Sequence, residues 1–384
     1  MSFTLPTELL SRATPFYYYD LALLEQTLTT LQEAAKPRGF HVHYAMKANA
    51  NLPLLERIRQ HGLGADCVSG GEVQRALAAG FAPQDVVFAG VGKSDAELNL
   101  ALAADIWCFN VESAEELTVL NELAGAQNRR ARVALRVNPN VDAHTHHYIT
   151  TGLEANKFGI SLTDLPAVVA QLPSLSNIEL VGLHAHIGSQ ITNLGVFGEL
   201  SQKLNELQDW LHDQGYELPH LNVGGGLGID YQTPDAHLIP DFETYFRTFE
   251  QHLVRRPGQQ VHMELGRAVV AQCGTLISRV LFVKRSQQTQ FAILDAGLTE
   301  LIRPALYGSH HHIQNLSSQG PVQPYDVVGP ICESSDRFGQ EVLLPQTKRG
   351  DLIALRSAGA YGEVMSSHYN LREKAPAYYG ELVK

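Results

Sequence analysis

Short apolar runs and amphipathic stretches alternate along the first two thirds of the chain. The runs repeat with period two, as strands do, and the stretches between them repeat every three to four residues, as helices do. Expected strands lie at 41–48, 64–69, 86–90, 106–111, 132–138, 178–188, 220–226 and 260–266, and the clearest helices at 21–35, 72–79, 114–123 and 197–211. About eight strands close a parallel barrel, so the pattern predicts an α/β fold with a (β/α)8 barrel of the TIM type.

Each expected strand has one apolar face and one face with polar side chains. In the run 178–188, Val181 and Leu183 alternate with His184 and His186. Helices would cover the apolar faces, and inward polar groups would converge near the carboxyl ends of the strands. The residues placed there are Lys47, Arg136, His186 and Glu264. Unrelated core polar groups would need the same coincidence on four strands.

The rhythm changes after Arg267. Runs such as QFAILDAG, YDVVGPIC and DLIALRSAGAY are strand-like and are separated by Gly, Pro, Asp and Ser. A chain of 384 residues also exceeds the usual size of a single core. We therefore expect a barrel at 27–266 and a second, mostly β domain formed by 1–26 together with 267–384.

Charge and cysteine content limit the possible partners. A formal net charge of -11 argues against nucleic acid or an anionic membrane, but a local cluster of donors can still bind a small anion. The sequence shows no signal-like N-terminus and no run of about eighteen apolar residues. The four cysteines form no C-x-x-C pair, so neither a zinc site nor a disulfide scaffold is indicated. We expect a soluble cytoplasmic protein.

The stretch HVHYAMKANAN at 41–51 carries the first candidate for chemistry. Its alternation places Lys47 on the inward face, at the end of the strand. Removing an ammonium from water favours the neutral amine, which can condense with a carbonyl, so Lys47 is a candidate Schiff-base lysine. Considered alone this argument is weak, because most strand lysines reach solvent along their stems.

Other elements suit pyridoxal phosphate. Gly224, Gly225 and Gly226 follow the seventh strand, where a barrel normally binds phosphate. A dinucleotide fingerprint is the competing interpretation, but Ile229 stands where its last glycine should be. Glu264 could keep the pyridine nitrogen protonated, which would make the ring an electron sink. An imidazole such as His186 could lie against that ring.

Seven motifs together give the chain a family resemblance. They are YAMKAN (44–49), DCVSGGE (66–72), HAHIGSQ (184–190), NVGGGLG (222–228), RPALY (303–307), GPICES (329–334) and SAGAYG (357–362). In this order, from about residue 14 to the end, the chain resembles diaminopimelate decarboxylases, which are fold-type III pyridoxal phosphate enzymes with an alanine racemase-like architecture. The resemblance implies decarboxylation of meso-2,6-diaminopimelate to L-lysine and carbon dioxide, the last step of lysine biosynthesis.

The resemblance also implies roles for individual residues. Lys47 would hold the cofactor, His186 would stack on it, and Glu264 would meet its ring nitrogen. The implied cofactor-binding set is Lys47, Asp66, Arg136, His186, Ser189, Gly225, Gly226, Glu264, Gly266, Arg267 and Tyr361. The family usually has proline where this chain has Leu265, so a small backbone adjustment is expected there.

Substrate recognition is implied in the same way. Arg267, Arg303 and Tyr307 would hold the distal carboxylate, with Tyr361 nearby, and Glu333 would bind the distal ammonium. Cys332 would be the proton donor, reaching with Glu333 into the partner's site in a head-to-tail homodimer. Guanidinium forks suit carboxylates, and a carboxylate suits an ammonium.

Two features and three rival functions remain. His310 to His312 cannot all face one ion, so no metal is expected, and the long connection 142–159 with Lys157 has no assigned role. The rivals are a decarboxylase of ornithine, arginine or carboxynorspermidine, a racemase, and a noncatalytic pyridoxal phosphate carrier. The pair of Arg267 and Arg303 disfavours the other decarboxylases, because it suits a substrate with a second carboxylate. The thiol of Cys332 disfavours a racemase, and the presence of the region 268–384 disfavours a noncatalytic carrier.

Overall fold

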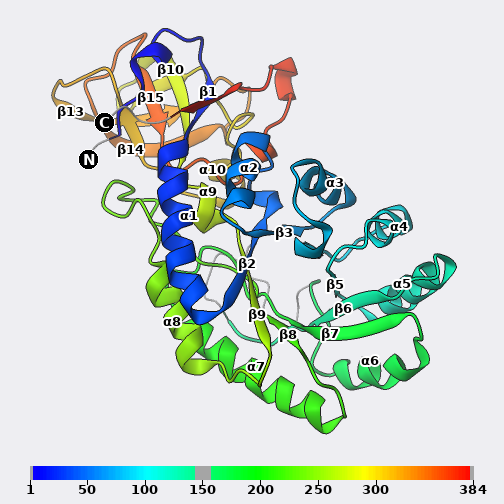
Figure 1. The fold of residues 1–384 in the computed structure, drawn as a ribbon. Coiled ribbons are helices and arrows are strands. Elements are labelled where there is room, and N and C mark those ends of the chain that lie inside the picture. Colours follow the sequence, from blue (N-terminus) through cyan, green and yellow to red (C-terminus); the bar gives the residue numbers. More distant parts are fainter. Residues whose placement is uncertain (1–2, 143–156, 381–384) are drawn as a thin grey trace. The chain divides into compact units, whose positions relative to one another are not determined.

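The computed structural model describes residues 3–142 and 157–380, which form two compact units. Of these residues, 28–228 and 241–266 form the first, here called the barrel unit. Residues 3–27, 229–240 and 267–380 form the second, here called the β unit. Figure 1 shows the ribbon of both. The segment 229–240 is an excursion from the barrel sequence, and it makes its contacts within the β unit.

The strands of the barrel unit are parallel and close on themselves. Within the described residues they follow the chain order from β2 to β9, and β9 pairs with β2, with His43 beside Glu264. The strands are β2 (Phe40–Ala45), β3 (Gly64–Cys67), β4 (Val86–Phe88), β5 (Cys108–Val111), β6 (Ala131–Arg136), β7 (Ile178–His184), β8 (His220–Asn222) and β9 (Gln260–Leu265). The predicted barrel is confirmed, although several strands end earlier than the apolar runs suggested.

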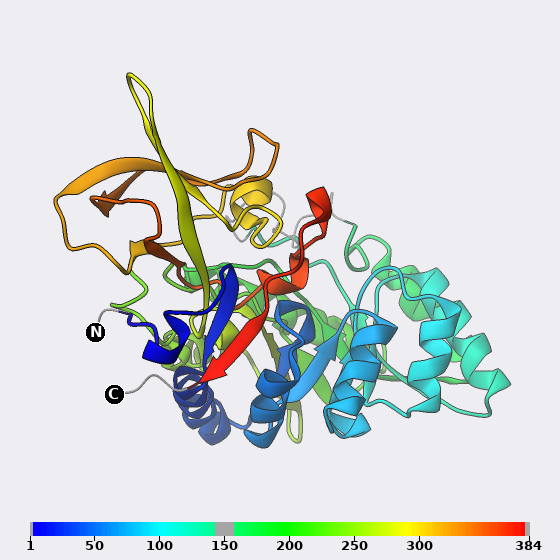
Figure 2. The same cartoon turned by 90° about the horizontal axis from the view of Figure 1, so that it is seen from above.

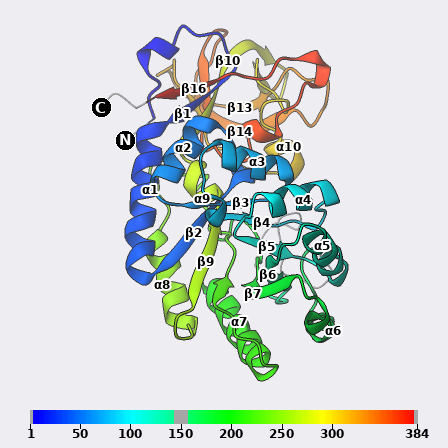
Figure 3. The same cartoon turned by 45° about the vertical axis from the view of Figure 1, so that its right-hand side comes forward.

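Helices flank these strands on the outside, as Figure 3 shows for α3, α4 and α5. The helices are α1 (Leu21–Ala35), α2 (Leu52–Gln60), α3 (Gly70–Ala78), α4 (Asp95–Ala103), α5 (Ala114–Ala126), α6 (Leu165–Gln171), α7 (Gly195–Asp213) and α8 (Phe242–His252). Phe197 of α7 packs edge-on against Tyr245 and at a tilt against Phe249, both of α8. These rings are fully buried, and burying such a side chain stabilises by about 1.5–3 kcal/mol.

Three successive helices begin with the same Ser-x-x-Glu signal. The hydroxyls of Ser69, Ser94 and Ser113 accept hydrogen bonds from the backbone N–H three residues later, at the starts of α3, α4 and α5. The glutamates at those positions accept backbone N–H groups from the preceding loops. A serine cap contributes about 1 kcal/mol. These caps fix the loops that follow β3, β4 and β5, at the mouth of the barrel.

The β unit is built on one eight-stranded sheet with the path β12-β15-β10-β11-β13-β14, to which β1 is added beside β10 and β16 beside β1. Its strands are β1 (Phe16–Asp20), β10 (Gly274–Arg285), β11 (Gln290–Leu294), β12 (Ile313–Asn315), β13 (Val322–Val328), β14 (Arg337–Pro345), β15 (Leu352–Leu355) and β16 (Ala377–Gly380). Its short helices are α9 (Arg267–Val270) and α10 (Arg303–Tyr307). The long ribbon of β10 and β11 is prominent in Figure 2. A mostly β second domain is thereby confirmed.

No helix within residues 3–142 and 157–380 has both the length and the hydropathy needed to span a bilayer. All four cysteines are free thiols. Cys67, Cys108 and Cys273 are buried, whereas Cys332 is exposed.

Candidate active site

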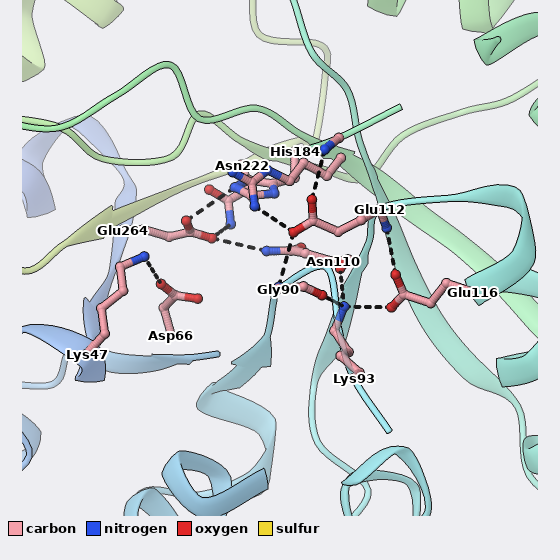
Figure 4. A network of polar contacts seen from close by, with 12 residues as sticks. Lys47, Asp66, Gly90, Lys93, Asn110, Glu112, Glu116, His184, Asn222 and Glu264 are labelled. Carbon is pink, nitrogen blue, oxygen red and sulfur yellow. Dashed lines mark hydrogen bonds and ion pairs between the residues drawn. The ribbon is translucent and has the colours of Figure 1, made fainter. Parts of the chain in front are cut away.

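Lys47 and Asp66 lie close together in the barrel unit (Figure 4). Lys47 belongs to a 3-10 turn, η3 (Met46–Ala48), because β2 ends at Ala45, before the lysine. Its Nζ is 4.0 Å from Oδ2 of Asp66 on β3. Within the described chain neither carboxyl oxygen of Asp66 accepts a hydrogen bond, although the residue is buried. Burial, and then the charge of Glu264, raises the pKa of Asp66.

Glu264 is fixed by three side chains from other barrel strands. Its Oε1 accepts hydrogen bonds from Asn222 (2.7 Å) and Asn110 (3.1 Å), and its Oε2 lies 3.2 Å from Nε2 of His184. Burial alone would raise the pKa of Glu264, but the charge and hydrogen bond of His184 lower it below the ordinary value. The site therefore contains a carboxylate that stays ionised at neutral pH and is already oriented.

Arg136 is held by the carboxylate of Glu112. At the end of β6, its Nη1 lies 2.6 Å from Oε1 of Glu112, and its guanidinium stacks over the ring of Phe158. Glu112 also accepts the backbone N–H groups of Gly90 and Gly159. Arg136 and Glu112 are both buried, and Glu112 is itself held by the two backbone N–H groups. The position of Arg136 in the barrel is therefore fixed.

Behind Glu112 lies a buried lysine, Lys93. Its Nζ donates to the carbonyls of Gly90 and Asn110, each at 2.8 Å, and to Oε1 of Glu116 at 2.6 Å. The same Glu116 accepts the backbone N–H of Glu112. Lys93 therefore ties the loop after β4 to β5 and α5 (Figure 4).

His186 meets the glycine turn that follows β8. The backbone N–H of Gly225 donates to its Nδ1 at 3.1 Å, which leaves Nε2 as the protonated nitrogen of the neutral ring. Burial, and then the charges of Lys47 and Arg136, lower the pKa of His186. A Cβ at Gly225 would lie 1.7 Å from the carbonyl oxygen of Glu264, and Gly226 has a φ of 111°. Only glycine suits this close backbone approach.

A second polar cluster lies wholly within the β unit. Nη1 of Arg267 donates to the hydroxyl of Tyr231 at 2.7 Å, and Nη2 of Arg303 donates to the same oxygen at 3.4 Å. Both guanidinium groups face the ring of Tyr361, at 5.0 and 5.9 Å from its centroid. Arg303 also lies 5.9 Å from the ring centroid of Tyr307. Both arginines are 5% exposed, so this unit holds two buried cations lined by aromatic rings.

Cys332 and Glu333 lie on an exposed loop between β13 and β14. The buried carboxylate of Asp336 secures the base of this loop, because it accepts the backbone N–H groups of Ile331 and Leu298, each at 2.6 Å. The hydroxyl of Tyr369 donates to Oε1 of Glu333 at 2.7 Å. The loop therefore presents a thiol and a carboxylate at the surface of the β unit.

The remaining predicted positions lie in the barrel unit. Ser189 is half-buried, and Gly266 packs so closely that an added Cβ would lie 3.0 Å from the Cβ atoms of Ala45 and Ala48. Leu265, in place of the family's proline, is buried and ends β9. In the connection 142–159, residues 143–156 lie outside the described residues, and Nζ of Lys157 lies over the ring of Phe158.

The histidines at 310–312 do not act as a group. Only His311 is fully buried, and its two ring nitrogens meet the backbone carbonyl of Arg356 and Nε of Arg303. Within residues 3–142 and 157–380, no group of three or more His, Cys, Asp or Glu side chains could hold a metal ion.

Several residues at these sites were not predicted. In the barrel unit they are Lys93, Asn110, Glu112, Glu116, His184 and Asn222, and in the β unit they are Tyr231 and His311. Strand alternation could have identified two of them, because His184 and Asn222 precede His186 and Gly224 by two residues on the same inward face. Tyr231 gave no such signal, since it lies on an irregular segment.

Comparison with known proteins agrees with this arrangement. Residues 21–271 match the family model described as the pyridoxal-binding domain of pyridoxal-dependent decarboxylases. The chain belongs to this family of pyridoxal phosphate enzymes. More specifically, it belongs to the diaminopimelate decarboxylases, since it is 57% identical to the one from Bacteroides thetaiotaomicron over 95% of both chains. The one from Vibrio cholerae is 44% identical, over 94% of this chain and 86% of the relative. The family resemblance drawn from the motifs is thus confirmed.

Solved structures give the same result. The crystal structure of Helicobacter pylori diaminopimelate decarboxylase complexed with L-lysine superposes with a TM-score of 0.91, at 39% identity, over 97% of this chain and 92% of that chain. A diaminopimelate decarboxylase from M. jannaschii, also complexed with L-lysine, gives 0.88 at 33% identity, over 96% and 87%. The Vibrio vulnificus lysine/ornithine decarboxylase, at 21% identity, shares the fold.

The barrel residues fit the cofactor of this family, pyridoxal phosphate. The buried carboxyl oxygens of Asp66 accept no hydrogen bond from the described residues, although Nζ of Lys47 is 4.0 Å away. The carboxylate of Glu264 is ionised, and among the described residues its Oε2 meets only His184, so it can still accept a protonated ring nitrogen. The turn at Gly225 and Gly226 has no side chain that would obstruct a phosphate.

Proposed function

We propose that this protein decarboxylates meso-2,6-diaminopimelate to L-lysine and carbon dioxide with pyridoxal phosphate, as the last step of lysine biosynthesis. The observation that supports this substrate is the pair of buried guanidinium groups in the β unit, Arg267 and Arg303, which share the hydroxyl of Tyr231. Arg303 has no carboxylate partner within the described residues. A buried cation without a protein anion suits a ligand that brings its own carboxylate.

The barrel residues would hold the cofactor. Lys47 would form the covalent attachment, and Glu264 would pair with the ring nitrogen. When bound, pyridoxal phosphate accepts the electron pair that the departing carboxylate leaves behind. His186 would lie against the ring, and Asp66 and Arg136 would complete its surroundings. The phosphate would be held by Ser189, Gly225, Gly226, the backbone from Glu264 through Gly266 to Arg267, and Tyr361.

The β unit would recognise the other end of the substrate. Arg267, Arg303 and Tyr307, with Tyr361, would bind the distal carboxylate. In a head-to-tail homodimer, the partner subunit's Glu333 would bind the distal ammonium, and the partner subunit's Cys332 would protonate the carbon that has lost its carboxylate. This proposal assigns the cofactor to the barrel at 27–266, and it makes 1–26 with 267–384 the domain that completes the site. The roles of Cys332 and Glu333 are supported by the exposed loop that carries both of these residues. A cytoplasmic location remains a prediction from the sequence.

The test of function is a comparison of substrates. Purified holoenzyme is incubated with meso-diaminopimelate, and L-lysine and carbon dioxide are measured, with ornithine, arginine and carboxynorspermidine assayed in parallel. We expect product only from diaminopimelate. Turnover of another amino acid in its place would establish the rival decarboxylase, and cofactor binding without any release of carbon dioxide would establish the carrier.

The attachment of the cofactor is tested separately. Borohydride reduction of the holoenzyme followed by peptide mapping should place the cofactor on Lys47. Lys203 is the control, since it is a surface lysine of α7 whose pairing with Glu206 does not involve the barrel interior. A label on any other residue, or no label, would contradict the proposed role of Lys47.

A further inference from the structure

Tyr231 lies between the two buried guanidinium groups of the β unit. Its oxygen accepts one hydrogen bond from Arg267 and one from Arg303. These two bonds use both acceptor positions of a phenol oxygen, so its own proton is left to donate. Within the described residues this proton has no acceptor. The hydroxyl is therefore an acceptor for two cations and still a donor for an anion that approaches them.

His311 holds the other side of Arg303. Its Nδ1 faces the backbone carbonyl of Arg356 at 3.0 Å, and a carbonyl can only accept, so Nδ1 carries the proton. Nε2 is then an acceptor, and it receives Nε–H of Arg303 at 3.3 Å. Burial, and then the adjacent charge of Arg303, lowers the pKa of His311 to about 3. The ring is therefore neutral, with a single tautomer, at any pH near 7.

These contacts determine which edge of Arg303 can meet a ligand. Nε is occupied by His311, and Nη2 donates to Tyr231 and to Ser309 Oγ at 3.3 Å. Nη1 has no acceptor within the described part of the chain. An incoming carboxylate would therefore meet the end of the guanidinium formed by Nη1 and Nη2. Both bonds of Nη2 are long, so it can shift toward an anionic oxygen at little cost.

The segment that supplies Tyr231 is itself anchored in the β unit. Nη2 of Arg356 lies 2.9 Å from Oδ1 of Asp235, and Nε2 of Gln272 donates to the carbonyl of His237 at 2.9 Å. Tyr231 is buried, and its ring packs edge-on against His311 at 5.1 Å. Tyr231 and His311, which both hydrogen-bond to Arg303, therefore also pack against each other.

We propose that Tyr231 and His311 are specificity-determining positioning residues. They fix Arg267 and Arg303 so that the enzyme selects ligands with a carboxylate at the distal end. This inference rests on the proposed function, in which those two arginines bind that carboxylate. It assigns to the 229–240 segment and to the central histidine of 310–312 a role in recognition in addition to folding.

The experiment compares two ligands that differ only in that carboxylate. L-lysine retains it and 1,5-diaminopentane lacks it, so the ratio of their affinities measures its recognition. Calorimetric titration of the holoenzyme gives this ratio without any need for turnover. In Tyr231→Phe we expect the ratio to fall about tenfold to a hundredfold, since a hydrogen bond to a charged group is lost. KM for diaminopimelate should rise more than kcat falls.

His311 provides a matched pair of variants. In His311→Gln the amide oxygen can replace Nε2 as the acceptor for Arg303, whereas in His311→Asn the shorter amide replaces only the donor at Nδ1. We therefore expect glutamine to retain most of the affinity ratio and asparagine to lose it. Tyr325→Phe is the control, because this tyrosine is buried in the same unit and its hydroxyl accepts the backbone N–H of Thr347, away from the arginines.

Three outcomes separate the possibilities. A reduced ratio in Tyr231→Phe and His311→Asn, but not in Tyr325→Phe, supports the inference. An unchanged ratio in folded Tyr231→Phe and His311→Asn overturns it, and if one variant fails to fold, the other decides. Failure of the wild-type holoenzyme to decarboxylate diaminopimelate would contradict the proposed function, and the measured affinity ratio would still show whether these residues select a carboxylate.

Discussion

Nε2 of His184 lies 3.2 Å from Oε2 of Glu264, and both side chains are buried inside the barrel. The imidazole lowers the pKa of a carboxyl group that burial would otherwise raise. Asn110 and Asn222 donate to the other oxygen, so the anion is held by polar groups from three further strands. The barrel interior therefore stabilises a negative charge at one fixed point.

The first prediction concerns that charge. Glu264→Gln should lower kcat about a hundredfold or more, because a neutral amide cannot hold a proton on the cofactor ring, while the cofactor stays attached. Activity is measured by carbon dioxide release, and attachment by visible absorbance. Glu179→Gln is the control, since Glu179 is exposed on β7. Normal turnover by Glu264→Gln would exclude the proposed pairing.

The second prediction concerns Lys93. Its side chain is 1% exposed and that of its partner Glu116 is 11% exposed, and Nζ donates three hydrogen bonds. Lys93→Met leaves a buried carboxylate without its cation, so the free energy of unfolding should fall by about 3–5 kcal/mol. Denaturant unfolding measures this change.

The control for Lys93 is the exposed pair of Lys203 and Glu206, whose charged atoms are 2.7 Å apart, compared with 2.6 Å for Lys93 and Glu116. Lys203→Met should cost less than about 1 kcal/mol, because water screens surface pairs. The double variant Lys93→Met with Glu116→Gln should recover part of the lost stability. If Lys93→Met were as mild as Lys203→Met, the buried network would not contribute as argued.

The third prediction concerns a row of histidines inside the barrel. Nε2 of His43 lies 3.0 Å from Nδ1 of His262, and Nε2 of His262 lies 3.1 Å from Nδ1 of His220. Nδ1 of His43 faces the carbonyl of Asp85, which can only accept, so every Nδ1 in the row must carry the proton. An added proton on His43 or His262 would set two donors against each other unless the neighbouring rings changed tautomer.

Acid should therefore weaken the fold in a defined range. Burial lowers the pKa of His43, and burial with the neighbouring imidazoles lowers that of His262. The unfolded chain takes up these protons near pH 6.5, whereas the folded chain does not. The contribution of these histidines to the free energy of unfolding is therefore fully present above pH 6.5 and falls as the pH decreases below that value. Unfolding measured from pH 7.5 to 5 should show this slope.

The variant His43→Asn with His262→Asn isolates the histidines, because it retains every other titrating group. We expect it to be less stable at pH 7.5 but to lose less stability on acidification. An identical slope in both proteins would show that the row does not resist protonation.

The alternation of apolar and polar residues was sufficient to predict the barrel, because parallel strands must repeat with period two and must be separated by helices. The same alternation placed Lys47, Arg136 and Glu264 on inward faces. It could not show that β2 ends at Ala45 and that a 3-10 turn carries the lysine, since strand ends depend on backbone hydrogen bonds with other strands.

The sequence alone could not predict which distant parts of the chain come into contact. Lys93 resembled an ordinary loop lysine, and its burial depends on Glu116 and on two backbone carbonyls. Likewise, Tyr231 lies far from Arg303 along the chain, and only folding brings its hydroxyl to the guanidinium. In the sequence nothing distinguishes His311 from its two histidine neighbours, because its burial and its contacts with Arg303 and the carbonyl of Arg356 arise on folding.

The fourth prediction concerns Cys332, which is the only exposed cysteine of the four. Burial raises the pKa of the Cys67, Cys108 and Cys273 thiols, so a brief treatment with iodoacetamide should modify Cys332 selectively. If this thiol is the proton donor, alkylation and Cys332→Ala should each lower kcat about a hundredfold to ten-thousandfold, with the cofactor still bound. Mass spectrometry locates the label.

Ser334→Ala, on the same exposed loop, should remain active and should still be inactivated by alkylation. Full activity of Cys332→Ala would show that another group protonates the product.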